Sequence, residues 1–353
     1  MSFNESIIVV NPGSTSTKMA YFEGELESLR ETILHDSVIL LSYKDVWGQY
    51  DFRLGLARIW TQKITDKPAA IVGIGGLLRP IPSGTYLINR AMLADARANL
   101  QGAHPSNLGC AIAYDLASYF GCPGFVVDPV SVDELLPIAR YSGHPLIERK
   151  SLAHALNIHA TARRAAFEIG KVYEESSFVV AHLGGGISVA PVQHGRIIDV
   201  NDASSDGPFS PDRTGGLPLQ QFVTLCFSGN YTEQEMRSLI MGRGGLFAYL
   251  GTTSGDEIEK RIVGGDEKAR QVYEAMCYQI SKEIGAMATV LSGGADAIVL
   301  TGGLAKSTRL TSLITARVEY IARVLTFPGE DEMAAMAHGA LRVLRGETQA
   351  KEY

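Results

Sequence analysis

The chain has 353 residues, of which 46% are hydrophobic and 20% charged, and its formal net charge is −6. This composition is typical of a soluble α/β enzyme with large buried cores, and the length predicts about two domains. The negative net charge and the lack of a run of five basic residues argue against nucleic acid as a partner. No stretch of about 18 uninterrupted apolar residues occurs, so we also expect no membrane partner.

The cysteines and the start of the chain indicate a compartment. The four cysteines are widely spaced and form no Cys-x-x-Cys pair. Such usage is typical of a reducing compartment and favours neither a disulfide framework nor a metal site. Met1–Glu5 leads into an apolar segment without a cationic region or a cleavage site, so we expect a cytoplasmic protein.

An apolar segment followed by a turn of small residues occurs twice. The first, at 7–18, reads Ile-Ile-Val-Val-Asn-Pro-Gly-Ser-Thr-Ser-Thr-Lys, and the second, at 179–188, reads Val-Val-Ala-His-Leu-Gly-Gly-Gly-Ile-Ser. Each predicts a strand, a glycine turn, a second strand, a charged glycine hairpin and a third strand. Backbone N–H groups in such turns can face an anion, and the missing side chains allow close approach. A duplicated unit of this kind can hold a phosphate chain from both sides.

The spacing of glycines supports the duplication. Gly184 follows Gly13 by 171 residues, and Gly195 follows Gly24 by the same interval. The spacing therefore predicts that the two turns and the two hairpins correspond pairwise.

Further elements follow in chain order in the first half. Periodicity and breakers predict a strand at 69–74 ending at Gly75-Gly76, helices near 90–100 and 107–120, and a strand at 125–127. Pro129 removes a ladder donor and ends this last strand, which leaves Asp128 at its carboxyl end. Open α/β sheets bind ligands at that end.

The second half begins with a long helix predicted at 151–170, with Gly170 as its C-cap. Breaker residues predict a loop at 203–218. Beyond it we expect a helix at 266–291 interrupted near Gly285, a strand at 297–300, and a final helix at 333–345. No flexible linker occurs, so the domains should be packed with a hinge.

Polar groups surround the glycine elements. The first loop combines Asn11, four hydroxyls and Lys18, all of which can donate to phosphate oxygens, although an ordinary hairpin with a polar tip has the same composition. The Gly-Lys-Ser/Thr ending of a Walker A loop is missing. Gly302-Gly303, after a strand, fits either a tight strand-to-helix turn or a nucleoside contact.

Each group of charged residues near these elements has two possible interpretations, one functional and one structural. Asp128 and the acidic residues at 330–332 are candidate Mg²⁺ ligands, and the latter also suit a helix N-terminus electrostatically. Arg213, in a Gly/Pro loop, could neutralise charge on a transferring phosphoryl group or be an ordinary exposed arginine. Three histidines, His104, His154 and His182, lie in or beside these elements; a lone histidine is more often structural, and no zinc spacing occurs.

Over essentially its whole length the chain resembles the acetokinase family, within the acetate and sugar kinase, heat-shock and actin superfamily. The resemblance rests on Val-Asn-Pro-Gly-Ser-Thr-Ser-Thr-Lys at 10–18, Ala-His-Leu-Gly-Gly-Gly-Ile-Ser at 181–188, Ser-Pro-Asp-Arg-Thr-Gly-Gly at 210–216, Leu-Thr-Gly-Gly-Leu-Ala at 300–305 and the Glu330-x-Glu332 start of the last helix. His-Leu-Gly-Gly-Gly, and the Gly-Gly-Leu-Leu-Arg-Pro at 75–80, are similar to the butyrate kinase branch.

The resemblance implies an α/β fold of two duplicated actin-like (ribonuclease H-like) domains with the nucleotide in the interdomain cleft. It places an N-terminal domain at 1–128 plus 330–353, with the C-terminal helix returning to it. The C-terminal domain at 129–329 would carry most nucleotide contacts.

The resemblance also assigns roles to residues. The phosphate and nucleotide contacts would be Asn11, Gly13, Ser14, Ser16, Lys18, Gly184, Gly185, Gly186, Gly302, Gly303 and Leu304. Catalytic roles would fall to Arg213, His154, His182, Asp128 and Arg79. Arg79 and His104 would belong to the substrate pocket, and Asp128 and Glu332 would organise Mg²⁺. The Gly251–Asp256 segment lacks the arginine that relatives often place near adenine.

The implied activity is reversible ATP-dependent phosphorylation of butyrate, or of a similar short or branched fatty acid, to the acyl phosphate, with ATP/ADP and Mg²⁺ as cofactors. The resemblance also implies a homodimer or larger homo-oligomer and a role in fermentation. An acetate or propionate kinase would differ only in pocket volume, which sequence does not resolve. A sugar or glycerol kinase and a non-catalytic actin-like nucleotide switch are the more distant alternatives.

Overall fold

A computed structural model describes residues 5–353, which divide into two compact units. Unit 1 consists of the described residues up to Asp133 together with Asp331–Tyr353, and unit 2 is Glu134–Glu330. None of the helices within residues 5–353 is long and apolar enough to cross a membrane.

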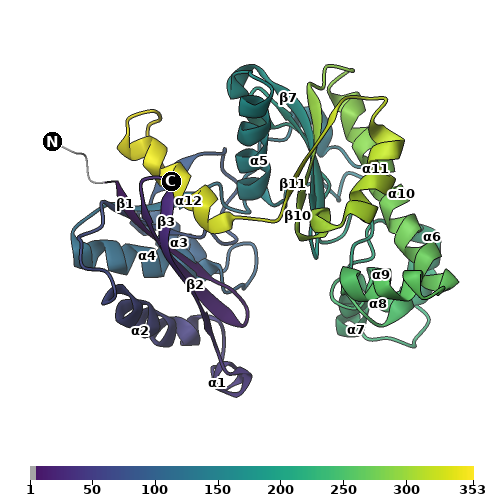
Figure 1. Ribbon diagram of the computed structural model, residues 1–353. Helices are drawn as coiled ribbons and strands as arrows, with labels where there is room; N and C mark the ends of the chain where they lie inside the picture. The colour runs from purple at the N-terminus through teal and green to yellow at the C-terminus, as the bar shows by residue number, and fades with distance from the viewer. Residues whose placement is uncertain (1–4) are drawn as a thin grey trace. The chain divides into compact units, whose positions relative to one another are not determined.

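Unit 1 is built on a seven-stranded mixed sheet with the order β12-β5-β6-β4-β1-β2-β3 (Figure 1). Its strands are β1 (Ser6–Pro12), β2 (Ser16–Glu23), β3 (Leu26–Leu34), β4 (Ala70–Gly73), β5 (Thr85–Leu87), β6 (Gly124–Val127) and β12 (Lys351–Glu352). β1, β4 and β6 are parallel, whereas β2 and β3 extend the sheet as antiparallel hairpins. The carboxyl ends of β1, β4 and β6 therefore meet at one edge.

Helices cover both faces of this sheet. They are α1 (Ser37–Leu41), α2 (Tyr50–Thr61), α3 (Arg90–Arg97), α4 (Asn107–Phe120) and α12 (Glu332–Leu344), with a 3₁₀ turn at Trp47–Gln49. The core of one face joins α2, α3 and α4 to alternate strand residues such as Ile8 and Val10. α12 packs on β1, β4 and β6. Gly339 allows the helix to approach closely, because a Cβ at this position would overlap Val127.

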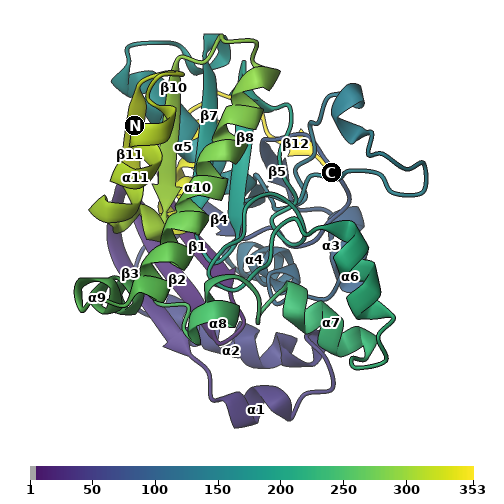
Figure 2. The same cartoon turned by 90° about the vertical axis from the view of Figure 1, so that its right-hand side faces the viewer.

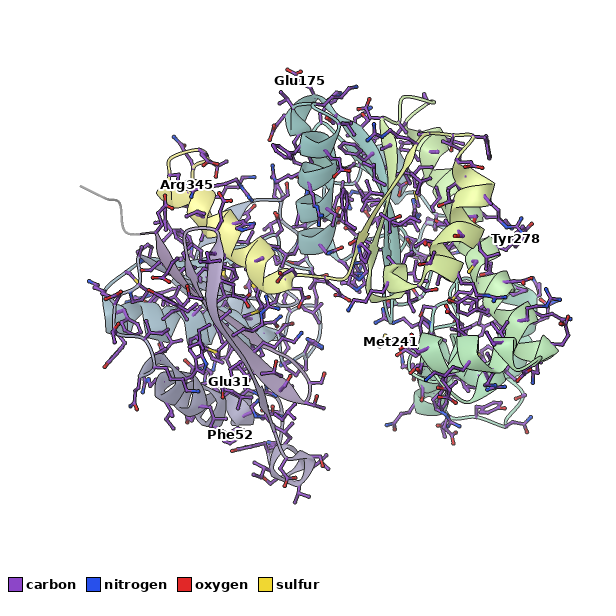
Figure 3. The ribbon with its side chains drawn as sticks, in the orientation of Figure 1. Glu31, Phe52, Glu175, Met241, Tyr278 and Arg345 are labelled. Carbon is purple, nitrogen blue, oxygen red and sulfur yellow. The ribbon has the colours of Figure 1, made fainter. Side chains whose placement is uncertain are left out.

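A cluster of charges anchors the end of α12 to the residue before β1 and to the turn between β2 and β3. The guanidinium of Arg345, labelled in Figure 3, donates to Glu5 at 2.9 Å and to Glu25 at 2.8 Å. Burial is slight here, so the ion pairs contribute little to stability beyond holding the segment in place.

Unit 2 contains a five-stranded sheet with the order β11-β10-β7-β8-β9. Its strands are β7 (Ser177–Leu183), β8 (Ile187–Gln193), β9 (Arg196–Ile197), β10 (Ala297–Gly302) and β11 (Val324–Pro328). Its helices are α5 (Ala155–Glu168), α6 (Leu219–Cys226), α7 (Glu233–Ile240), α8 (Gly245–Leu250), α9 (Gly255–Val263), α10 (Glu267–Val290) and α11 (Thr308–Val318), with 3₁₀ turns at Pro137–Arg140, Tyr173–Glu175 and Gly303–Lys306.

α5 and α10 lie on opposite faces of the unit 2 sheet. α5 packs on β7, β8 and β10, whereas α10 crosses β7 and β8 with α11 beside it (Figure 2). Apolar residues of α10 and α11 form one core with alternate residues of β7, β8 and β10. The predicted duplication is therefore visible in the topology: β3-β2-β1-β4-β6 and β9-β8-β7-β10-β11 have the same order and the same strand directions.

The strand register shows that the predicted correspondence between residues of the two units is off by one residue after the first turn. Asn11 lies opposite Lys18 in the first hairpin, whereas His182 lies opposite Ser188 in the second. The second turn is one residue shorter, so Ser188, not Val189, is the counterpart of Lys18. Three successive glycines close this turn without side chains to accommodate.

The predicted pairing of Gly24 with Gly195 is consequently wrong. Glu23 pairs with Leu26, and Gln193 pairs with Arg196. Gly24 therefore corresponds to His194, and both have a positive φ, 62° and 51°. Gly195 is the second residue of its turn.

The predicted interruption of the long helix near Gly285 is also wrong. α10 is continuous over Glu267–Val290, and no atom lies within 4 Å of where a Cβ at Gly285 would be. One glycine costs about 1 kcal/mol in a helix, which the packing of α10 outweighs. The strands predicted at 69–74, 125–127 and 297–300 and the loop at 203–218 are confirmed, whereas the helix predicted from 151 begins at Ala155.

Candidate active site

The turn between β1 and β2 presents several donors to solvent. The Gly13 N–H donates to the Ser16 carbonyl at 2.8 Å, which closes the loop. Ser14 and Lys18 are exposed and Ser16 is half-buried. These groups remain available to an anion.

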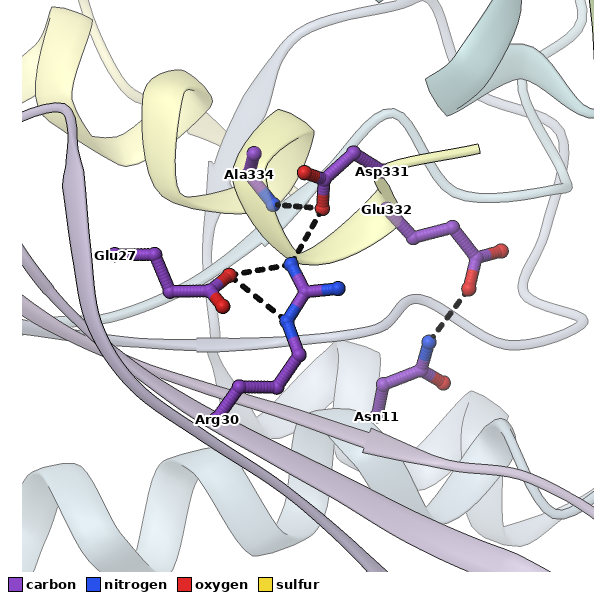
Figure 4. Close-up of polar contacts among 6 residues, drawn as sticks. All are labelled: Asn11, Glu27, Arg30, Asp331, Glu332 and Ala334. Atoms are coloured by element: carbon purple, nitrogen blue, oxygen red, sulfur yellow. Dashed lines mark hydrogen bonds and ion pairs between the residues drawn. The ribbon is translucent and has the colours of Figure 1, made fainter. Parts of the chain in front are cut away.

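Asn11 lies near the end of β1 and contacts the start of α12. Its side-chain amide donates to the Glu332 carboxylate at 2.8 Å (Figure 4). Asp331 caps the same helix by accepting from the Ala334 N–H at 3.2 Å, and Arg30 donates to Asp331 at 2.7 Å. The cap fixes where the helix begins and so places Glu332 over the carboxyl edge of the sheet.

Asp128 lies at the same edge, after β6. It is buried with a φ of 37°, and its Oδ1 accepts from the Gly84 N–H at 2.6 Å. One carboxylate oxygen thus bonds the backbone just before β5, and the other is left for a ligand. Within residues 5–353, no group of three or more His, Cys, Asp or Glu side chains could hold a metal ion. Mg²⁺ usually takes only one or two carboxylates together with waters and substrate phosphates, which Asp128 and Glu332 fit.

Arg79 and His104 lie elsewhere in unit 1. The Arg79 guanidinium forms an ion pair with Asp95 at 2.5 Å and lies 4.8 Å from the ring centre of Tyr353. A substrate carboxylate would have to compete with Asp95 for this side chain. His104 is exposed before α4, and its Nδ1 contacts the Ser106 hydroxyl at 2.8 Å.

The turn between β7 and β8 consists of Gly184–Gly186. The Gly184 N–H donates to the Gly186 carbonyl at 3.2 Å, and no atom lies within 4 Å of a Cβ built on Gly185. A Cβ at Gly186, in contrast, would overlap the Arg213 guanidinium. The missing side chain at Gly186 therefore makes the space that Arg213 uses.

Arg213 is held beside this turn by its own loop. Its Nη1 donates to the Ala203 carbonyl at 2.8 Å, and its Nε lies 3.6 Å from the Asp212 carboxylate. Backbone bonds pin the loop, from Ser210 N–H to the Arg213 carbonyl and from Thr214 N–H to the Ile240 carbonyl, both at 3.0 Å. Nη2 makes no hydrogen bond within the described chain, so this edge of the guanidinium can donate to an anion.

Two stacked imidazoles lie beneath the second loop. The rings of His154 and His182 are 3.9 Å apart with an interplanar angle of 12°. His182 Nδ1 donates to the Asn157 side-chain oxygen at 2.8 Å, and His154 Nδ1 contacts the Ser188 hydroxyl at 3.0 Å. His182 is buried at the end of β7, and α5 supplies Asn157.

Burial keeps both rings neutral. Desolvation, with a smaller contribution from the Arg213 charge, lowers the pKa of His154 to about 4. Desolvation and then the neighbouring His154 lower the pKa of His182 well below its ordinary value. Since Nδ1 of His182 carries the proton, its Nε2 is an acceptor, and it lies 3.9 Å from the Glu330 carboxylate.

The third glycine element follows β10. Gly302 has a φ of 91°, and a Cβ there would overlap the Leu183 backbone, so this glycine is required by packing. Gly303 has no atom within 4 Å of its Cβ position and is exposed, whereas Leu304 is half-buried. Only Gly303 therefore offers open backbone to a ligand.

The structure adds residues that sequence reasoning missed. Asn157 and Ser188 hold the two histidines, and buried Arg53 contacts the first loop. Asn157 follows His154 by three residues, a helical spacing that signals a shared face. No comparable signal in the sequence marks Arg53.

Comparison with known proteins agrees with the fold. The acetokinase family matches residues 136–329 of the chain. A structure of acetate kinase from Porphyromonas gingivalis is similar with a TM-score of 0.78 and 17% identity, and the match covers 96% of this chain and 99% of that one. At this identity, the similarity shows the fold.

Two curated relatives match nearly the whole chain. A protein of Caldanaerobacter subterraneus named "Probable butyrate kinase 2" is 51% identical, and the match covers 98% of this chain and 99% of that protein. "Butyrate kinase 2" of Clostridium acetobutylicum is 47% identical with the same coverage. The resemblance predicted from the loop motifs is confirmed, and the chain belongs to the acetokinase family.

Proposed function

We propose that this protein transfers the γ-phosphoryl group of ATP to butyrate, or to a similar short or branched fatty acid, and that the reaction also runs in reverse. Identity of about half with proteins named butyrate kinase over the whole chain supports this activity. The observation that carries the proposal is the Arg213 guanidinium, held against the side-chain-free Gly186 with one face open.

The chemistry suits these residues. A fatty-acid carboxyl group titrates near pH 4, so the nucleophile is already an anion at pH 7 and needs no general base. One carboxylate oxygen forms the new bond to Pγ, the bond from Pγ to the β,γ-bridging oxygen breaks, and ADP leaves with that electron pair. Two anions must meet in line, so the requirement is positioning and charge neutralisation. Arg213 supplies charge in unit 2, and Asn11, Ser14, Ser16 and Lys18 supply donors in unit 1.

We assign the histidines a supporting role in this proposal. His154 and His182 are neutral and stacked, so neither brings a positive charge of its own. Their buried rings exclude water beside Arg213, and an ionic interaction is stronger there than in water. Gly303 is the proposed backbone contact for the nucleoside.

Mg²⁺ is the proposed metal, held by Asp128 and Glu332 through carboxylate oxygens. Bound there, it would neutralise phosphate charge on the nucleotide. Asn11 keeps Glu332 oriented, and Gly84 keeps Asp128 oriented. From the family resemblance we also propose that the protein forms a homodimer or a larger homo-oligomer. We further propose that it acts in fermentation in the cytoplasm.

A hydroxamate-trapping assay tests the activity. The protein is incubated with Mg·ATP, hydroxylamine and an acid series from acetate to valerate that includes isobutyrate, and Arg213→Ala is run in parallel. We expect acyl hydroxamate to peak at four or five carbons and to vanish in the variant. A peak at acetate would contradict the proposed acid, and no hydroxamate with any acid would contradict the activity.

A further inference from the structure

A buried arginine lies directly behind the first loop. Arg53, on α2, has no exposed surface, and its Nη1 donates to the Ser16 carbonyl at 3.0 Å and to the Thr17 hydroxyl at 3.1 Å. Its Nε and Nη2 donate to the Gln49 side-chain oxygen at 3.1 and 2.9 Å. All of these acceptors are neutral, and no carboxylate within residues 5–353 forms an ion pair with Arg53.

The hydrogen bonds continue from Arg53 through Thr17 to His35. Arg53 can only donate, so the Thr17 oxygen accepts from it, and the same hydroxyl is hydrogen-bonded to His35 Nε2, 2.9 Å away. Burial, and then the Arg53 charge, lowers the pKa of His35, which favours the neutral ring. The His35 backbone N–H also donates to the Thr15 carbonyl at 2.9 Å. Thr15, Ser16 and Thr17 are thus all held from behind.

This arrangement leaves a positive charge uncompensated. A buried charge that is hydrogen-bonded but not ion-paired is costly, and an arginine stays charged at neutral pH even though burial lowers its pKa. The Ser16 carbonyl also accepts from the Gly13 N–H, so this acceptor stays hydrogen-bonded when Arg53 is removed. The exposed side of the same loop carries the Ser14 hydroxyl. A phosphoryl anion on that side would supply the missing negative charge.

We propose that Arg53 is a positioning residue for phosphoryl transfer, which holds Gly13–Thr17 in shape and provides a buried positive charge that is balanced only when a phosphoryl group binds the loop. This inference rests on the proposed function of the loop. A purely structural arginine would stabilise the ligand-free protein. An arginine that awaits an anion costs stability until the anion arrives, so its removal should leave the ligand-free protein unharmed.

The test compares three variants by thermal unfolding, with and without Mg·ATP, and by steady-state kinetics. Arg53→Met keeps the volume and removes the charge, Arg53→Lys keeps the charge without the planar fork, and Arg58→Met removes an exposed charge from the same helix as a matched control. Without ligand, we expect Arg53→Met to unfold at the wild-type temperature or above it. Its ATP-induced rise in unfolding temperature should fall by more than half, and kcat/KM by about 100-fold.

The other variants sharpen the result. Arg53→Lys should keep most of the ATP-induced rise while kcat falls, since the charge remains and the loop geometry does not. Arg58→Met should match the wild type in all readouts. If Arg53→Met does not fold, the split between ATP-induced stabilisation and kcat in Arg53→Lys decides the question.

Two outcomes would overturn the inference: Arg53→Met that unfolds earlier without ligand yet keeps the full ATP-induced rise, or Arg53→Lys with unchanged kcat. The proposed function fails separately. If the wild type is stabilised by Mg·ATP but forms no acyl phosphate, the activity is wrong, while the loss of stabilisation in Arg53→Met still supports the role of Arg53 at the loop.

Discussion

The turns after β1 and β7 occupy the same place in two duplicated units, yet they are built differently. The first carries its donors on its own residues, Ser14, Ser16 and Lys18, whereas the second is three bare glycines. In both units the polar residue that ends the strand contacts the first turn of the helix on the same face. Asn11 donates to Glu332 of α12, and His182 donates to Asn157 of α5.

The difference concerns where the positive charge comes from. The first loop has Lys18 nearby in sequence and Arg53 beneath it. The second has no cation of its own and makes room for Arg213, which arrives from the 203–218 loop. The same backbone scaffold thus serves one turn that carries polar side chains of its own and one that admits a guanidinium from elsewhere.

Removal of Arg213 should have the largest effect. We expect Arg213→Ala to lower kcat by about 10³-fold or more, because a guanidinium that neutralises transferring phosphoryl charge contributes on that scale. Lys18→Ala should cost less, since other donors remain in its loop. Steady-state kinetics with butyrate and ATP measure both, with circular dichroism as the folding control. Equal losses would contradict the asymmetry between the loops.

The stacked histidines make the second loop acid-sensitive. The unfolded chain binds a proton at His154 below its ordinary pKa of 6.5, whereas the native ring does so only near 4. The native state is therefore favoured fully above pH 6.5 and loses about 3 kcal/mol as the pH falls from 6.5 to 4. Urea unfolding between pH 4.5 and 7.5 should show this slope in the wild type and a flatter one in His154→Gln. Parallel slopes would show that His154 is not the group responsible.

Two adjacent glycines give a matched pair. Gly186→Ala should lower kcat by about 100-fold, because its methyl group displaces the Arg213 guanidinium, and a side chain can move without unfolding the protein. Gly185→Ala should lower kcat far less, as its Cβ meets no atom within 4 Å and leaves the Arg213 guanidinium in place. Kinetics and unfolding temperatures of the two variants check this, and similar activities would mean that Arg213 does not depend on the space at Gly186.

The smallest effect is expected in the first loop. A Cβ at Gly13 would lie 3.7 Å from the Ser16 carbonyl, an ordinary contact, and Gly13 does not have a positive φ. Gly13→Ala should therefore change the free energy of unfolding by no more than about 0.5 kcal/mol. Chemical denaturation measures it. A large loss would indicate a constraint on this loop that its packing does not show.

Much of this organisation was predictable because it is local. The strands that carry Asn11 and His182 near their ends contain apolar runs, and the glycine turns follow these strands directly. The loop at 203–218 could be read from its Gly and Pro content. The family resemblance supplied the order of the remaining elements.

What could not be predicted depends on packing across the chain. Arg53 lies in an ordinary amphipathic helix, and only the folded unit brings it to Ser16. The pairing of Arg79 with Asp95 and the one-residue slip that makes Ser188 the partner of His182 are likewise settled by tertiary contacts and strand register. The equal 171-residue spacing of the glycines did not reveal this register difference, because sequence spacing does not show which residues are hydrogen-bonded across the strands.

The most direct test follows an oxygen atom. Butyrate labelled with ¹⁸O in both carboxylate positions is incubated with the protein, Mg·ATP and hydroxylamine, and the inorganic phosphate is analysed by mass spectrometry. Hydroxylamine attacks the acyl carbon and expels phosphate with its bridging oxygen, so direct transfer to the carboxylate predicts one ¹⁸O per phosphate. Phosphate without ¹⁸O would mean that water is the nucleophile, and would contradict a carboxylate kinase.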